Sequence, residues 1–291
     1  MKSRLKENIW GWLFVLPTVT GLIILNIYPI FRTIWQSVHR VGDFGIGNEF
    51  VAFENYSRIF SGDVIWQTTF NTIFYTALEV PASIAIGLVL AVFLNEKIRG
   101  RTVFRTIFFL PMVAAPAAIA MVWLWLYNPR YGLINNAFNL GVHWTTSGDV
   151  AIYSMAIIGI WSVIGYNMIL FLAGLQTIPR DYYEASAIDG ATGIRQFFRI
   201  TLPLISPMLF FVAVTRVMAA MQIFDTIFMV IGTAGNPAMP RTQSLVFLFY
   251  REAFMVRSWG MGAAVVVWLM FLIALITVLQ FLIQRKWVHY E

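Results

Sequence analysis

Six long runs of apolar residues, separated by shorter polar segments, set the pattern of this chain. Each run is long enough for a helix to cross the roughly 30 Å hydrocarbon core of a bilayer. A helix is the expected form, because lipid offers no partners to backbone N–H and C=O groups. The predicted spans are residues 10–31, 70–94, 106–127, 150–175, 204–231 and 261–283. The pattern therefore predicts an all-α integral membrane protein with six transmembrane helices.

The composition indicates the same class. Of the 291 residues, 59% are hydrophobic and 12% are charged, and the mean hydropathy is +0.73. A soluble domain carries about 25% charged residues, so the lipid bilayer is the predicted solvent. No nucleic acid is expected as a partner, since the net charge of +6 is not accompanied by a soluble fold with a basic face. The absence of cysteine excludes disulfides and thiolate metal sites.

The basic residues of the loops predict which side of the membrane each loop faces, because Lys and Arg are retained on the cytoplasmic side. One alternating set of loops and termini holds twelve of the 20 cations: Lys2, Arg4, Lys6, Lys97, Arg99, Arg101, Arg105, Arg180, Arg195, Arg199, Arg285 and Lys286. The opposite set holds seven. Both termini are therefore predicted to be cytoplasmic, and an even number of spans agrees with this.

The first run stands apart from the other five. A polar stretch over 36–67 separates them and is expected to form an ordered extracytoplasmic loop. The run is long enough to span, and no small-residue cleavage site follows it. It is therefore interpreted as an uncleaved helix and not as a signal peptide.

The segment between the fourth and fifth runs is predicted to contain two short helices. Pro179 suits the first turn of a helix, and Asp181 and Glu184 favour the positive end of its dipole. Small residues follow, and Gly190 can end the helix in a left-handed conformation. A second short helix is expected at about 193–198. The segment is expected to lie across the cytoplasmic membrane face, as a docking element or as an ordinary interfacial hairpin.

The spacing within this segment matches a known motif. Glu184-Ala185-Ser186, three residues, Gly190, nine residues and Ile200-Thr201-Leu202-Pro203 follow the pattern E-A-A-x3-G-x9-I-x-L-P, with Ser186 at the second Ala. The segment resembles the cytoplasmic coupling loop of binding-protein-dependent ABC importer permeases. In that family the loop docks the membrane subunit onto its ATPase.

The resemblance covers about residues 9–285 and is to the carbohydrate group of that family. It points to the maltose, lactose and glycerol-phosphate type and to the first permease of the pair. Similar segments lie at 109–111, 123–129, 131–135, 175–179, 222–225 and 249–254. The chain departs from the pattern at Ser186 and at 232–237, which lacks the usual Thr-x-Gly-Gly-Pro turn. It also lacks the large outer domain and extra N-terminal helices of the maltose subunit.

The resemblance implies a type-I ABC importer permease fold in the cytoplasmic membrane of a bacterium or archaeon. The implied partners are a second homologous permease subunit, an ABC ATPase dimer and an extracytoplasmic solute-binding protein. ATP and Mg would bind the ATPase, and this chain would bind no cofactor. The coupling-loop residues carried over are Tyr183, Glu184, Ala185, Ser186, Asp189, Gly190, Arg195 and Pro203.

The expected organisation follows from the runs and the resemblance together. Residues 1–66 would form a cytoplasmic segment, the first transmembrane helix and an outer loop. Residues 67–285 would form a five-helix transport core that includes the coupling loop at 177–203. Residues 286–291 would form a cytoplasmic tail.

Three ionisable residues lie inside predicted spans, at Glu79, Arg216 and Asp225. A charge in lipid is costly, so each should face protein or a water-filled path. Arg216 and Asp225 lie about 13 Å apart along a helix and are not expected to pair directly. Each residue is open to a structural role at a helix contact or membrane edge, or to lining the translocation path.

The fourth and fifth spans also carry groups suited to a sugar cavity. The candidates are Trp161, Tyr166, Asn167 and Gln222. Aromatic faces stack on sugar C–H surfaces, and amides bridge hydroxyls. Membrane packing is the alternative for the aromatic residues, and an interhelical hydrogen bond is the alternative for the two amides.

The predicted function is a permease subunit that translocates a sugar or oligosaccharide delivered by a solute-binding protein. Glycerol phosphate or another polyol is the alternative substrate. An ion-coupled secondary transporter is an alternative class, but clear ionisable relays or inverted repeats are not found. No catalytic constellation or metal spacing supports an enzyme. The chain has no G-x-x-x-x-G-K-[ST] phosphate loop, so ATP hydrolysis is expected on a separate subunit.

Overall fold

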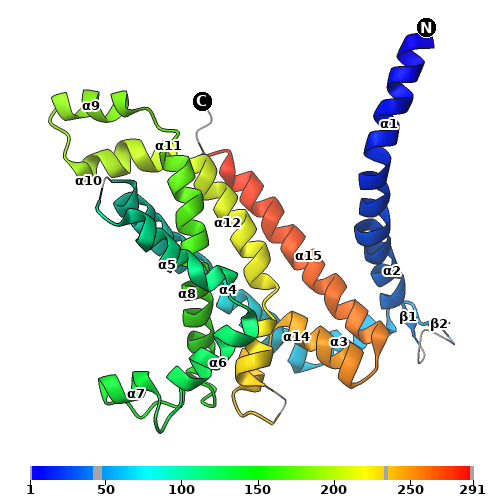
Figure 1. Ribbon diagram of the computed structural model, residues 1–291. Helices are drawn as coiled ribbons and strands as arrows, with labels where there is room; N and C mark the ends of the chain where they lie inside the picture. The colour runs from blue at the N-terminus through cyan, green and yellow to red at the C-terminus, as the bar shows by residue number, and fades with distance from the viewer. Residues whose placement is uncertain (1, 42–47, 97, 233–234, 289–291) are drawn as a thin grey trace. The chain divides into compact units, whose positions relative to one another are not determined.

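The computed structural model describes residues 2–41, 48–96, 98–232 and 235–288, with side chains from Gly11 onward. Most of the described chain is helical (Figure 1). Parts of the predicted outer loops and of the 286–291 tail lie outside the described residues.

The elements follow one another in a simple order. Their bounds are α1 Lys2–Leu22, η1 Ile23–Ile27, α2 Tyr28–Ser37, β1 His39–Arg40, β2 Glu49–Phe50, α3 Glu54–Phe60, α4 Asp63–Asn95, α5 Arg101–Val113, α6 Pro116–Leu126, α7 Leu133–Phe138, α8 Ala151–Leu175, α9 Arg180–Ile188, α10 Gly193–Gln196, η3 Phe197–Thr201, α11 Leu202–Leu204, α12 Ser206–Met221, η4 Ile227–Ile231, α13 Met239–Thr242, α14 Leu245–Tyr250, η5 Arg251–Met255 and α15 Trp259–Gln284. The η segments are single π-helical turns. The only strands among the described residues are the two-residue β1 and β2.

Four stretches of helix in the described chain are long and apolar enough to cross a membrane. They are Gly11–Ser37, Asp63–Asn95, Ala151–Leu175 and Trp259–Gln284. Two further pairs of helices meet the same criteria only when each bent pair is taken together. The described chain therefore has between four and six candidate spans, and each of the six predicted runs overlaps one of these segments.

The prediction that residues 106–127 form one continuous helix is wrong. The segment is divided into α5 and α6, which meet at an angle of 102°. Ala114 and Ala115 between them are extended, with ψ of 145° and 137°. Pro116 explains the break, because a proline disfavours the helical conformation of the residue before it.

The predicted helix over 204–231 is also broken. Its entry bends by 67° between α11 and α12, where Pro207 has no N–H to donate to the preceding turn. α12 ends at Met221, and residues 222–224 are not helical. The hydroxyl of Ser244 donates to the carbonyl of Ile223 over 2.6 Å. Gln222 and Asp225 therefore lie beyond the end of α12, and not within it as predicted.

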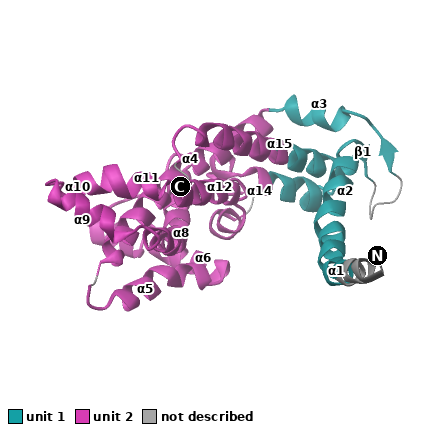
Figure 2. Ribbon diagram, turned by 90° about the horizontal axis from the view of Figure 1, so that it is seen from above, with its two compact units in different colours: residues 1–62, 248–268 teal, residues 63–247, 269–291 magenta. Residues whose placement is uncertain are grey.

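The chain forms two compact units (Figure 2). The first comprises residues 1–62 and 248–268, and the second comprises 63–247 and 269–291. The predicted organisation into 1–66, 67–285 and 286–291 concerns functional parts and stays a prediction. The candidate site residues all lie in the second unit.

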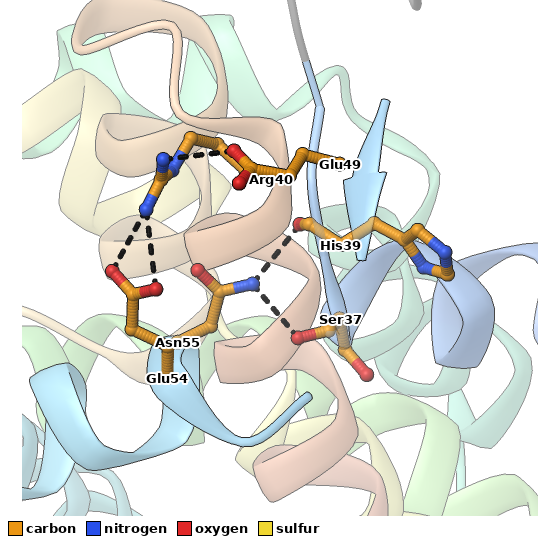
Figure 3. Close-up of polar contacts among 6 residues, drawn as sticks. All are labelled: Ser37, His39, Arg40, Glu49, Glu54 and Asn55. Carbon is orange, nitrogen blue, oxygen red and sulfur yellow. Dashed lines mark hydrogen bonds and ion pairs between the residues drawn. The ribbon is translucent and has the colours of Figure 1, made fainter. Parts of the chain in front are cut away.

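The first unit is organised around the β1–β2 hairpin and α3 (Figure 3). The Arg40 guanidinium donates to carboxylate oxygens of Glu49 over 3.0 Å and of Glu54 over 2.9 Å. The buried Asn55 amide donates to the carbonyls of Ser37 and His39. A Cβ at Gly260 would collide with the His39 carbonyl. The start of α15 thus packs directly on the hairpin.

The second unit has a core in two parts, one at each end of α8. One part joins the start of α8 to α6, the end of α12 and η4. Its buried side chains include Tyr127, Ile152 and Ala220. The other joins the end of α4, the end of α8 and Ile205 at the start of α12. Burial of these side chains away from lipid and water orders the α4–α8–α12 group.

Glycines allow the helices of this unit to approach closely. A Cβ at Gly87 of α4 would lie 2.8 Å from the Cβ of Asn167 on α8. One at Gly165 of α8 would overlap the backbone of Phe108 on α5. Small residues at helix contacts are typical of membrane bundles, where close packing replaces the hydrophobic driving force.

Candidate functional site

The predicted coupling loop is a helical hairpin at one end of α8, with α6 and α7 at the other end (Figure 1). α9 begins directly after Pro179, which is extended with ψ of 139°. α10 begins at Gly193 and continues through η3 into α11. The structure thus confirms the two short helices that the sequence predicted. None of the nine residues of α9, all of which are described, is buried.

Gly190 forms the reversal between the two limbs. Its φ is +75°, in the left-handed region that glycine adopts without strain. Its N–H donates to the carbonyl of Ala187 over 3.0 Å, and the N–H of Ala191 donates to the carbonyl of Ser186 over 2.9 Å. These two bonds make a Schellman motif. The predicted left-handed helix end is therefore confirmed, and its signal was local in the sequence.

Side-chain hydrogen bonds tie α9 to the limb that follows it. The Gln196 amide donates to Ser186 Oγ over 3.0 Å and to the Tyr183 carbonyl over 3.2 Å. Ser186 Oγ donates to the same carbonyl over 2.9 Å. The Tyr183 hydroxyl pairs with Thr201 Oγ1 over 3.0 Å. Gln196 and Thr201 were not among the predicted site residues, because no pattern in the sequence indicates that they bond to Ser186 and Tyr183.

The remaining predicted loop residues face outward. Glu184, Ala185, Asp189 and Arg195 are exposed, and Pro203 is half-buried at the turn into α12. A shallow cavity of about 210 Å³ lies beside the reversal, and Asp189, Arg195 and Arg199 are among its lining residues. The loop therefore presents an uncovered polar surface that carries both signs of charge.

Two of the three intramembrane ionisable residues form a buried ion pair. Arg216 Nη2 on α12 lies 2.7 Å from Glu79 Oε1 on α4. The Glu79 side chain is fully buried, and that of Arg216 is 12% exposed. Sequence reasoning weighed Arg216 only against Asp225 and missed this partner, which is 137 residues away in the chain. The pair contacts protein, as expected for charges in a membrane.

Asn167 also bridges two helices. It is fully buried on α8, and its amide donates to Ser83 Oγ on α4 over 3.2 Å. This is the interhelical contact that the sequence left open as the alternative to lining a path.

The other path candidates are not brought together. Trp161 is exposed and packs edge-on against Trp123, with ring centroids 5.7 Å apart. Tyr166 is half-buried. Gln222 is exposed, and its amide donates back to the carbonyl of Met218 over 2.8 Å.

A cavity of about 190 Å³ opens where the two broken segments meet α8. Pro111, Ala114 and Pro116 line it from the α5–α6 break, and Asp225 and Thr226 line it from the segment after α12. Ile158 and Ser162 of α8 complete the wall. Sequence reasoning singled out Asp225 but not Ser162, because the cavity that both residues line forms only where the two segments are broken. Among the described residues, no group of His, Asp or Glu side chains could hold a metal ion.

Comparison with known proteins gives a consistent result. The profile of the family described as "Binding-protein-dependent transport system inner membrane component" matches residues 83–289. The chain is 34% identical to the sn-glycerol-3-phosphate transport system permease protein UgpA of Yersinia enterocolitica, and 36% identical to the UgpA of Pectobacterium atrosepticum. Each alignment covers 96% of this chain and 95% of the relative.

The fold has a close match among solved structures. A chain of a bacterial alginate ABC transporter, solved with an alginate pentasaccharide-bound periplasmic protein, superposes with a TM-score of 0.86. The match covers 98% of this chain and 97% of that chain at 18% sequence identity. At this identity the likeness concerns the fold alone.

Proposed function

The chain belongs to the family of inner membrane components of binding-protein-dependent transport systems, and we propose that it imports a sugar or oligosaccharide as the permease subunit of an ATP-driven transporter. The observation that carries the proposal is similarity at 34–36% identity along nearly the whole chain to permease subunits. The uncovered helical hairpin after α8 supports it, because such a subunit needs a surface for its ATPase.

Glycerol phosphate or another polyol is the second candidate substrate. The curated relatives named above are permeases for sn-glycerol 3-phosphate, and their similarity to this chain favours that substrate class. The alginate transporter supports the fold and not the substrate.

The proposed topology has six spans and both termini in the cytoplasm of the producing cell. The loop charges support it. The end of α4, the end of α8 and the start of α12 share one part of the core, so the loops at these ends lie on one side of the membrane. Phe210, near the start of α12, contacts Phe281 and Trp287 of the C-terminal region, with ring centroids 5.2 and 6.3 Å apart. This supports a C-terminus on the same side.

The proposed mechanism begins at the hairpin. A second permease subunit, an ATPase dimer and an extracytoplasmic solute-binding protein complete the transporter, and ATP and Mg bind the ATPase. Closure of the ATPases moves α9 and α10. The motion passes through η3 and the bend at Ile205 into α12, which carries Arg216 and ends near the cavity at Asp225. The change in α12 alternates access to the substrate path.

The test is uptake by proteoliposomes that contain the chain with its ATPase, second permease and binding protein. Radiolabelled maltooligosaccharides and sn-glycerol 3-phosphate are compared, with ATP inside the vesicles and with ion gradients collapsed. We expect uptake that needs both ATP and the binding protein. Uptake driven by a proton or sodium gradient without ATP would instead indicate a secondary transporter. Preference for glycerol phosphate would select the second candidate.

A further inference from the structure

The helix that presents the coupling surface has little core to hold it in place. No residue of α9 or α10 is buried, and both elements are fully described. At the reversal, no described atom outside Gly190 and its two chain neighbours lies within 4 Å of the position that a Cβ of Gly190 would take. Thr192 leaves the reversal in an extended conformation, with ψ of 161°. Backbone geometry at 189–192 therefore leaves a site at which the hairpin could flex.

We propose that Ser186 and Gln196 are positioning residues that lock α9 onto α10, so that the hairpin moves as one body during coupling. The proposal rests on the proposed function, because it assumes that an ATPase pushes on α9. We call these two side chains and the Tyr183 carbonyl the hairpin clamp. Its three hydrogen bonds form a closed triangle with lengths of 2.9, 3.0 and 3.2 Å.

The clamp spans the point of flexion. Ser186 and Tyr183 belong to α9, before the reversal, whereas Gln196 ends α10, after it. A single Gln196 amide thus holds both a side chain and a backbone carbonyl of the opposite limb. Loss of this amide would remove two hydrogen bonds that join the limbs, whereas the contact between the Tyr183 hydroxyl and Thr201 would remain.

The clamp also lies directly on the route to the membrane. Gln196 is followed without a break by η3, α11 and the bend at Ile205. Ile205 is buried with the ends of α4 and α8. A rigid hairpin would therefore transmit a displacement of α9 into α12, whereas a flexible one would absorb it at 189–192.

Ser186 is the feature of the sequence that the motif did not explain. It stands where the E-A-A pattern has alanine. An alanine has no oxygen to accept the Gln196 amide or to donate to the Tyr183 carbonyl. The hydroxyl therefore adds two of the three bonds of the clamp, and this gives the departure from the pattern a physical role.

The first test measures the hairpin itself in the full chain. The sequence has no cysteine, so spin labels attach only at Ile188→Cys and Ile194→Cys, whose native side chains are 88% and 76% exposed. Electron paramagnetic resonance then gives the distribution of distances between the limbs. We expect a broader distribution in Ser186→Ala and in Gln196→Ala. The double variant should be no broader than Gln196→Ala.

Two variants serve as matched controls. Ser186→Thr keeps the hydroxyl and should keep the narrow distribution. Gln176→Ala removes an exposed glutamine near the same end of α8 and should also leave the distribution of distances narrow. An unchanged distribution in Ser186→Ala and Gln196→Ala would overturn the clamp.

The second test measures coupling in the assembled transporter. We expect substrate transported per ATP to fall about three- to tenfold in Ser186→Ala and Gln196→Ala while assembly is retained, the factor that corresponds to one hydrogen bond of ordinary strength. Ser186→Thr should restore the ratio. A loss of assembly or of protein yield with an unchanged ratio would show a merely structural role and overturn the proposal.

The two tests separate this proposal from the proposed function. A wild-type chain that assembles with no ATPase overturns the proposed function and, with it, the coupling role. If the wild-type chain couples normally but both alanine variants transport with the wild-type ratio, the proposed function stands and the positioning role is overturned.

Discussion

At the scale of single residues, the Glu79–Arg216 ion pair buries two opposite charges in the second unit. Both charges lie within segments predicted to cross the membrane, and the carboxylate is fully buried. Transfer of either charge out of water is costly, and the pair offsets that cost only while both partners are present. The pair joins α4 to α12, so it constrains the helix that follows the coupling loop.

Removal of one partner should therefore destabilise the protein strongly. We expect Arg216→Met to lower the free energy of unfolding by about 3–5 kcal/mol, because it leaves a buried carboxylate without its counter-charge. The double variant Glu79→Gln/Arg216→Met should recover most of this loss. Unfolding in detergent, followed by tryptophan fluorescence, measures both.

The matched control is Arg40→Met. This arginine pairs with Glu49 and Glu54, but its side chain is 55% exposed, so we expect a loss of no more than about 1 kcal/mol. If the double variant is as unstable as Arg216→Met, the two charges do not act as a pair.

At the scale of elements, local signals were readable from the sequence and distant ones were not. Gly190 marked the end of α9 because a left-handed helix end depends on one residue and its neighbours. The break at Ala114 and Ala115 was not predicted, although Pro116 indicates it. The span was predicted from the hydrophobicity of the whole run, and a single proline changes that average little. At the break after Met221, the carbonyl of Ile223 accepts a hydrogen bond from Ser244, which is 21 residues away in the chain and which the run of apolar residues does not indicate.

The candidate site divides in the same way. The coupling hairpin was predicted with its two helices because motif spacing and helix ends are local. The contacts of Gln196 and Thr201 with α9 were not predicted, because a hydrogen bond between the two limbs produces no periodic pattern in the sequence. The Glu79–Arg216 pair and the cavity at Asp225 arise only when segments far apart in the chain pack together.

The reversal at Gly190 gives a prediction for one element. Any other residue at φ of +75° is strained, by roughly 1–2 kcal/mol. We expect Gly190→Ala to loosen the hairpin and to lower the rate of transport-coupled ATP hydrolysis. Gly193→Ala is the matched control, because Gly193 also has open space around it but does not have a positive φ. Equal coupling in the two variants would show that the left-handed turn is dispensable.

At the scale of the whole molecule, the proposed topology places the two parts of the core in the second unit toward opposite sides of the membrane. One part includes the ends of α4 and α8 and the start of α12, which lie nearest the predicted coupling loop. The other includes the start of α8 and the end of α12. Since α8 joins them, the loop directly before α8 should be accessible from the side opposite to the loops that follow α4 and α8.

Cysteine accessibility tests this arrangement without interference from native thiols. Thr146, before α8, and Arg99, after α4, are both exposed. We expect an impermeant maleimide to label Thr146→Cys in intact cells, after permeabilisation of the outer membrane if there is one. Arg99→Cys should be labelled only after lysis. The reverse pattern would invert the topology.

The central claim is that α9 passes the motion of an ATPase to the transport path. The most direct measurement is substrate uptake and ATP hydrolysis, recorded together in proteoliposomes that contain the complete transporter with Glu184→Lys in this chain. Glu184 is exposed on α9, so the substitution reverses a charge on the proposed docking surface without disturbing a core. We predict that coupled hydrolysis and uptake fall together while membrane insertion and substrate capture by the binding protein persist. Uptake and coupled hydrolysis at the wild-type rates would contradict the claim.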